Sequence, residues 1–85
     1  MPVTVKRVKY VPVRTGAQAK DLRTKLGLSQ EAFWKKVRVT QSCASRYESG
    51  RDIPVPVQIL LTITYRSMSE ADSIVADLRD GKLKL

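Results

Sequence analysis

Four polar side chains near the middle of the chain are spaced to share one face of a helix. Gln41 and Ser42 are followed one helical turn later by Ser45 and Arg46, at separations of three and four positions. A glutamine side chain can form two hydrogen bonds with adenine, and an arginine can do the same with guanine. The grouping therefore predicts that Gln41, Ser42, Ser45 and Arg46 contact the edges of DNA bases.

The residues around this group predict two short helices joined by a tight turn. Ser29 is a candidate N-cap for a helix over about 30–37, and Thr40 is the candidate N-cap for a helix over about 41–49. Only two residues separate the first helix from the second cap, so the two helices must cross sharply. In a helix-turn-helix of this kind, the second helix enters the major groove with its N-terminal residues facing the bases.

Three further segments show helical periodicity. They run over about 17–26, 56–65 and 69–80, with apolar residues recurring at spacings of three and four. Thr15 is the candidate N-cap of the first, and Ser69 begins the last. The expected fold is therefore all-α, with five helices.

The chain divides into a basic end, a helical body and a tail. Residues 1–14 carry β-branched side chains with four positive charges and no acid, and they predict a basic arm or an edge strand. A solvated arm and a strand in a dimer interface both remain open for this segment. Residues 15–80 hold the predicted helix-turn-helix domain, and residues 81–85 form a tail that alternates like a short strand.

Composition restricts the functions that this chain can have. Its 85 residues suffice for one small domain, and its net charge of +8 favours a polyanion as partner. One cysteine and no histidine exclude a Cys/His metal site and an internal disulfide, and no catalytic set or cofactor motif is present. No apolar run has the length of a membrane span. We expect a cytoplasmic, nucleoid-associated protein that binds double-stranded DNA, is not an enzyme and needs no cofactor, metal or membrane.

The segment 28–51 resembles the helix-turn-helix of Cro/cI-type repressors of the XRE family, found in phages and mobile elements. The resemblance rests on LSQE at 28–31, VTQS at 39–42 and SRYESG at 45–50, and it extends over about 17–65. It implies a five-helix, lambda-repressor-like DNA-binding domain. It also implies a homodimeric repressor that reads a palindromic operator with the 41–49 helix in the major groove.

The resemblance also assigns roles to individual residues. It supports the four base contacts, although Arg46 has the alternative of pairing with Glu48 or a phosphate. Glu48 itself is expected to cap the helix or to pair locally. The residues expected to contact DNA phosphates are Gln30, Lys35, Arg38, Thr40 and Arg51.

Three positions depart from the family pattern. Trp34 stands where the family has a small residue, and Ala44 stands where it has a bulky one. Because a volume-conserving exchange is well tolerated in a core, we expect both to be core residues rather than Trp34 to stack on a base. Arg38 stands where the family commonly has glycine, so the turn either differs or tolerates a positive φ.

The last helix suggests where a second copy binds. Ile74, Val75 and Leu78 exceed what a four-helix core needs, which places the predicted dimer interface in the last helix and tail. The alternative interface is the Val3–Val13 segment. The alternative function is that of an antitoxin, which binds a toxin protein and represses its own operon.

Overall fold

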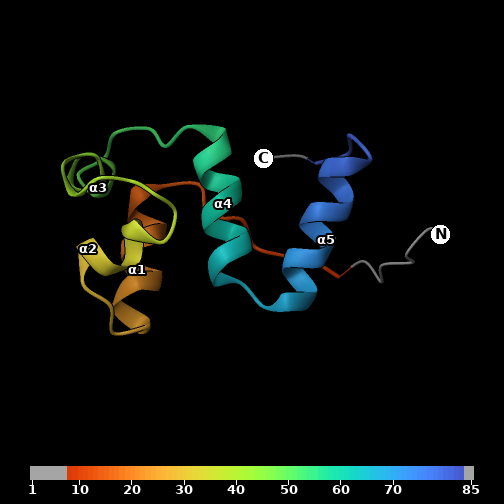
Figure 1. Cartoon of the computed structure of the whole chain (residues 1–85), viewed down its shortest axis with the longest axis horizontal. Helices are drawn as coiled ribbons and strands as arrows, with labels where there is room; N and C mark the ends of the chain where they lie inside the picture. The colour runs from red at the N-terminus through yellow and green to blue at the C-terminus, as the bar shows by residue number, and fades with distance from the viewer. Residues whose placement is uncertain (1–7, 84–85) are drawn as a thin grey trace.

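The computed structural model describes residues 8–83, which fold into five helices with no strand among them. The helices are α1 (Gly16–Lys25), α2 (Gln30–Lys35), α3 (Gln41–Glu48), α4 (Val55–Tyr65) and α5 (Met68–Arg79). The predicted all-α fold is confirmed. Figure 1 shows α1, α2 and α3 together at one end, α4 beside them and α5 on the far side of α4. None of the described helices is long and apolar enough to cross a membrane.

The starts of the first three helices follow from local side-chain chemistry. The hydroxyl of Thr15 accepts a hydrogen bond from the Gln18 backbone N–H, and the Gln18 side chain accepts one from the Thr15 N–H in return. Ser29 caps α2 and Thr40 caps α3 in the simpler way, each accepting from a backbone N–H three residues later. All three predicted N-caps are confirmed.

The last helix begins earlier than predicted. It begins at Met68 rather than at Ser69, and its N-cap is Ser67, whose hydroxyl accepts a hydrogen bond from the backbone N–H of Glu70 and donates one to the Glu70 carboxylate. Glu70 in the first turn also interacts favourably with the helix dipole. The Ser67–Glu70 pair therefore sets the first turn of α5.

Aromatic side chains join the helix-turn-helix to α4. Phe33 lies edge-on to Trp34, with ring centroids 5.6 Å apart, and stacks on Tyr65 of α4 at 4.2 Å. The Tyr65 hydroxyl donates to the backbone carbonyl of Phe33. These rings lie in one core, whose buried members are Val13, Ala19, Phe33, Trp34, Val37, Ala44, Ile53 and Leu61.

The segment before α1 packs along the helices instead of forming a strand. The backbone N–H of Val13 donates to the hydroxyl of Thr62 at 2.9 Å, and Arg66 donates to the carbonyl of Val11 at 2.8 Å. Residues 11–13 therefore hydrogen-bond to α4 and its C-terminal end, and the edge strand is not found within residues 8–14. Residues 1–7 lie outside the described range. At the other end, residues 82–83 form no strand, and residues 84–85 are not described.

Helix α5 is held by α4 and by the N-terminal segment. Ala71 and Ile74 are buried, and α4 is the helix with which α5 makes its main contacts. Val8 donates from its backbone to the buried hydroxyl of Ser73, and the Tyr10 hydroxyl donates to the Asp77 carboxylate. The interface expectation for Ile74 is therefore wrong, because this side chain is only 1% exposed and belongs to the chain's own interior.

Candidate nucleic-acid interface

Helix α3 presents its polar face to solvent. Gln41, Ser42, Ser45 and Arg46 are all exposed, and the helix brings them together on one side as their spacing predicted. Ala44, on the other side, is fully buried. The two short serine side chains and the two long side chains of Gln41 and Arg46 thus form a polar surface that can enter the major groove of DNA.

The other end of α3 is set against α1 by a very close backbone approach. A Cβ atom built on Gly16 would lie 1.7 Å from the carbonyl oxygen of Tyr47, which no real contact allows. Glycine is therefore required for α1 to begin at this distance from the end of α3. The sequence analysis missed this residue, because a glycine next to an N-cap gives no signal of a neighbour distant in the sequence.

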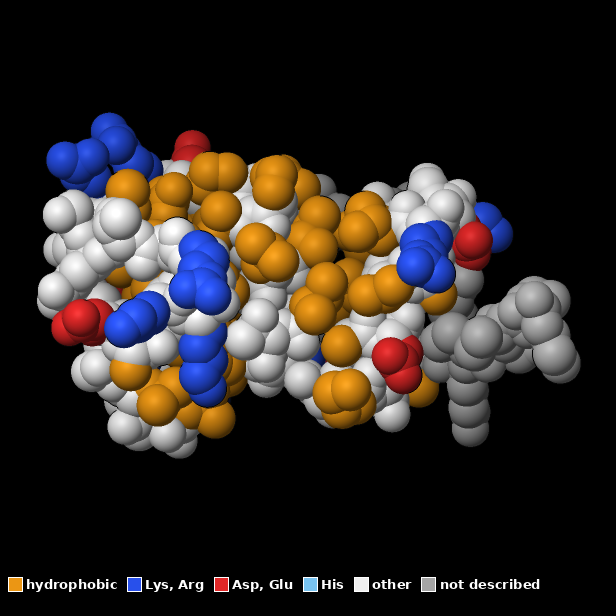
Figure 2. Space-filling model, in the orientation of Figure 1, with side chains coloured by type: hydrophobic (Ala, Val, Ile, Leu, Met, Phe, Trp, Pro, Cys, Tyr) orange, Lys and Arg blue, Asp and Glu red, His pale blue; other side chains and the backbone are white. Residues whose placement is uncertain are grey.

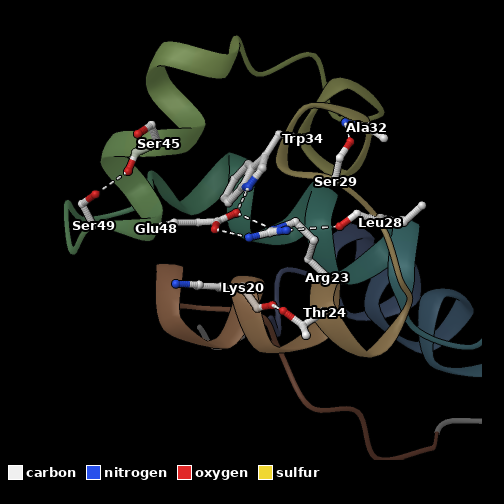
Figure 3. A network of polar contacts seen from close by, with 10 residues as sticks. All are labelled: Lys20, Arg23, Thr24, Leu28, Ser29, Ala32, Trp34, Ser45, Glu48 and Ser49. Carbon is white, nitrogen blue, oxygen red and sulfur yellow. Dashed lines mark hydrogen bonds and ion pairs between the residues drawn. The ribbon is translucent and has the colours of Figure 1, made fainter.

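A charged cluster at the end of α3 connects all three helices of the site (Figure 3). The guanidinium of Arg23, on α1, donates to both carboxylate oxygens of Glu48, at 2.8 and 3.0 Å. The indole nitrogen of Trp34, on α2, donates to the same carboxylate at 2.7 Å. Arg23 also donates to the carbonyl of Leu28 in the loop between α1 and α2, at 3.1 Å. This cluster, which we call the Glu48 clasp, consists of Arg23, Leu28, Trp34 and Glu48.

The clasp keeps Glu48 charged although its side chain is only 4% exposed. Burial alone raises the pKa of this carboxyl. The hydrogen bonds from Arg23, Trp34 and Gln30, with the positive charge of Arg23, outweigh burial and bring the pKa below its usual value of 4.5. Glu48 therefore has a structural role, as expected, but its ion-pair partner is distant in sequence rather than local.

The partners of Glu48 exclude one of the two alternatives for Arg46, that of pairing with Glu48. The carboxylate is occupied by Arg23 and Trp34, and no ion pair within residues 8–83 involves Arg46. The guanidinium of Arg46 is exposed beside Gln41 and Ser42 on α3. Its five donors therefore remain available for a ligand.

Trp34 belongs to the core. It is fully buried, its ring centroid lies 5.5 Å from that of Tyr47, and Ala44 is buried in the same cluster. The expectation that both positions are core residues is confirmed, and base stacking by Trp34 is excluded by its burial. The hydrogen bond from Trp34 to Glu48 was not foreseen, because a residue's size does not show where its polar atom finds a partner.

The turn between α2 and α3 has an unusual backbone conformation at Arg38. Arg38 has a φ of 63°, in the left-handed region that glycine adopts most easily. Its backbone N–H donates to the carbonyl of Lys35 at 3.0 Å, and that of Val39 donates to the carbonyl of Trp34 at 3.2 Å. The sequence left two possibilities, a different turn or a positive φ at Arg38. The structure has the positive φ, so Arg38 tolerates the backbone strain.

The predicted phosphate contacts lie in different environments. Lys35, Arg38 and Arg51 are exposed. The Thr40 hydroxyl accepts the capping hydrogen bond of α3, which leaves its own proton free to be donated. Gln30 is half-buried and hydrogen-bonds Glu48 through its amide.

Charge is distributed unevenly along the molecule. Residues 8–67 contain eleven basic and four acidic residues, a net charge of +7, whereas residues 68–83 contain two basic and four acidic residues, a net charge of −2. Figure 2 shows most of the Lys and Arg side chains on its face over the end that holds α1, α2 and α3. Most of the positive charge of the described residues thus lies outside α5, on the part of the chain that includes α3.

Comparison with known proteins agrees with this geometry. Residues 20–64 match the family described as RsaL-like HTH domain, and the match includes all of α2 and α3. Because it covers more than half of the chain, the protein belongs to this family and is a helix-turn-helix DNA-binding protein. No curated protein and no solved structure matches the chain. The narrower resemblance to Cro/cI-type repressors is not confirmed.

Proposed function

We propose that this RsaL-like helix-turn-helix protein is a sequence-specific transcriptional repressor that binds a palindromic operator as a homodimer. The observation that carries the proposal is the exposed polar face of α3, formed by Gln41, Ser42, Ser45 and Arg46. A protein that occupies the major groove excludes other proteins from the same DNA. Repression by occupancy is therefore the simplest regulatory result.

The base contacts follow from the order of residues on α3. Gln41 and Ser42 begin the helix, so they enter the groove first. Arg46 lies one turn further along and has no acidic partner among residues 8–83, which suits a bidentate contact with guanine. Ser45 is short enough to allow the helix to approach the bases between these longer side chains.

The phosphate contacts surround that face. Lys35, Arg38 and Arg51 supply exposed positive charge. Thr40 keeps a hydroxyl proton, and the Gln30 amide has two donor hydrogens, so that its hydrogen bond to Glu48 leaves one for a phosphate. These five contacts would orient α3 without selecting a sequence.

Two-fold symmetry supplies the specificity that one small domain lacks. A single module covers one half-site, whereas a dimer covers two half-sites about one helical turn apart. This is the reason for proposing a homodimer and a palindrome together.

The proposal is tested by selecting the preferred sequence from random duplexes and then footprinting the protein on it. We expect a two-fold-symmetric footprint and binding that resists scrambled competitor DNA at two salt concentrations. If every duplex competes equally and modest salt abolishes binding, the protein has only a basic surface and the proposal is wrong.

A further inference from the structure

One side of α5 is left uncovered by the chain. Its inner side is buried through Ala71 and Ile74, and a second side receives the N-terminal segment at Ser73 and Asp77. The remaining side carries exposed apolar residues that no described element covers: Met68 is 78% exposed, Val75 37% and Leu78 48%.

This uncovered side continues onto α4 through a groove. Val55 and Ile59 of α4 line the groove together with Leu78 and Leu83, and it holds about 310 Å³. Figure 2 shows hydrophobic side chains continuing from α4 onto the α5 end, with basic and acidic side chains beside them on α5. An exposed apolar surface of this kind between two helices is typical of a protein–protein contact.

Two charged residues are placed symmetrically about the centre of this side. Asp72 precedes Val75 by three positions and Arg79 follows it by four, so all three lie on one helical face with Met68. Both Asp72 and Arg79 are exposed. We call Met68, Asp72, Val75, Leu78 and Arg79 the α5 outer face.

This spacing makes the α5 outer face complementary to itself. If two copies of α5 lie antiparallel across a two-fold axis near Val75, Asp72 of each copy faces Arg79 of the partner subunit, and the pair forms twice. The same alignment brings the exposed side chains of Val75 and Leu78 near the two-fold axis. A second copy therefore matches both the charges and the apolar residues of this surface.

We propose that the α5 outer face and the adjoining α4–α5 groove form the homodimer interface, with two antiparallel α5 helices joined by reciprocal Asp72–Arg79 pairs. This inference rests on the proposed homodimer and specifies its surface. The net charge of −2 over residues 68–83 favours a protein over a nucleic acid as the partner of this face. An interface here also leaves the polar face of α3 free for DNA.

The test is a charge exchange, measured by sedimentation of the full chain without DNA. Asp72→Arg alone and Arg79→Asp alone should each raise the dimer dissociation constant about tenfold or more, because each places two like-charged pairs in the interface. The double variant Asp72→Arg/Arg79→Asp should restore the wild-type constant to within about threefold. A wild-type chain that stays monomeric at high micromolar concentration, or a double variant as weak as the single ones, would overturn the proposal.

A second pair of variants tests the apolar part of the proposed dimer interface. Leu78→Glu should give monomer, whereas Leu26→Glu should leave the dimer intact, since Leu26 is equally exposed at 48% but lies outside the groove. Equal effects of the two substitutions would contradict the assignment. Circular dichroism checks that each variant is folded.

Failure of this interface and failure of the proposed function give different results. If the operator is bound specifically but the charge exchange changes nothing, the interface is misplaced and the function stands. If the exchange behaves as expected but no sequence is preferred, the function is wrong and the interface stands. Affinity for a single half-site should be unchanged in all four single variants, because none of them alters α3.

Discussion

The indole nitrogen of Trp34 donates a hydrogen bond to the carboxylate of Glu48 at 2.7 Å, and so connects the core of the helix-turn-helix to the last turn of α3. Glu48 is at the same time paired with Arg23 of α1. One buried carboxylate thus fixes α3 relative to both preceding helices. The exposed face of α3 depends on that position, because α3 is short and makes its main contacts with α1 and α2.

Replacing Trp34 by phenylalanine should destabilise the protein. Trp34→Phe keeps an aromatic ring in the core but removes the donor to a charged acceptor, and the expected loss is about 1–3 kcal/mol. The free energy of unfolding from urea denaturation measures it. A double-mutant cycle with Glu48→Gln should show coupling between the two positions. If the two losses simply add, the hydrogen bond contributes nothing of its own.

Lowering the pH should remove the contribution of Glu48. Its pKa is lower in the folded than in the unfolded chain, so the folded state binds fewer protons and is favoured above the usual value of 4.5. That contribution is lost as the pH falls through the folded pKa. Glu48→Gln should therefore be about 2 kcal/mol less stable at pH 7, and the difference should narrow below pH 4.5. A difference that is constant with pH would contradict the ion pair with Arg23.

Adding a methyl group at position 16 should separate α1 from α3. Gly16→Ala places a Cβ 1.7 Å from the Tyr47 carbonyl oxygen, and relief requires backbone movement at a cost of about 3 kcal/mol or more. Gly27→Ala is the matched control. Its φ of 71° adds strain of about 1 kcal/mol, but no atom lies within 4 Å of the new Cβ. Thermal unfolding should rank the two variants in this order, and the reverse order would exclude the close approach.

Relieving the backbone strain at Arg38 should stabilise the fold. Arg38→Gly suits the φ of 63° and should add about 1 kcal/mol to the free energy of unfolding. Arg38→Lys keeps the charge and the strain, so its stability should be unchanged. If Arg38 contacts a phosphate, the glycine variant should also bind DNA with a smaller dependence on salt, whereas the lysine variant should not. A glycine variant no more stable than the wild type would show that the strain is negligible.

The parts of the fold predicted from sequence are those set by neighbouring residues. The caps at Thr15, Ser29 and Thr40 each need a partner only three residues away, and a helix places Gln41 and Arg46 on one face by its own geometry. The left-handed turn at Arg38 was foreseen as a possibility through the family resemblance alone. Local chemistry thus indicated the five helices and the exposed polar face.

The contacts that position this face could not be read in the same way. The Arg23–Glu48 ion pair joins residues 25 positions apart in the sequence. Gly16 at the start of α1 lies against the backbone of Tyr47 in α3. Ile74 and Leu78 belong to one apolar stripe in sequence, yet the first is buried and the second is exposed. Such features depend on how helices pack, and periodicity within one helix does not determine that.

The most direct test of sequence-specific binding by α3 compares wild type with Arg46→Ala on the selected operator and on scrambled DNA. The wild type should prefer the operator by a factor of about a thousand or more. Arg46→Ala should lose about 1–3 kcal/mol on the operator, relax the preference at one base pair and bind scrambled DNA almost as before. Lys9→Ala, which removes one charge from the segment beside α5, should show little change on either DNA. An equal loss for Arg46→Ala on both DNAs would make Arg46 a phosphate contact, and a wild type without preference would contradict base recognition by α3.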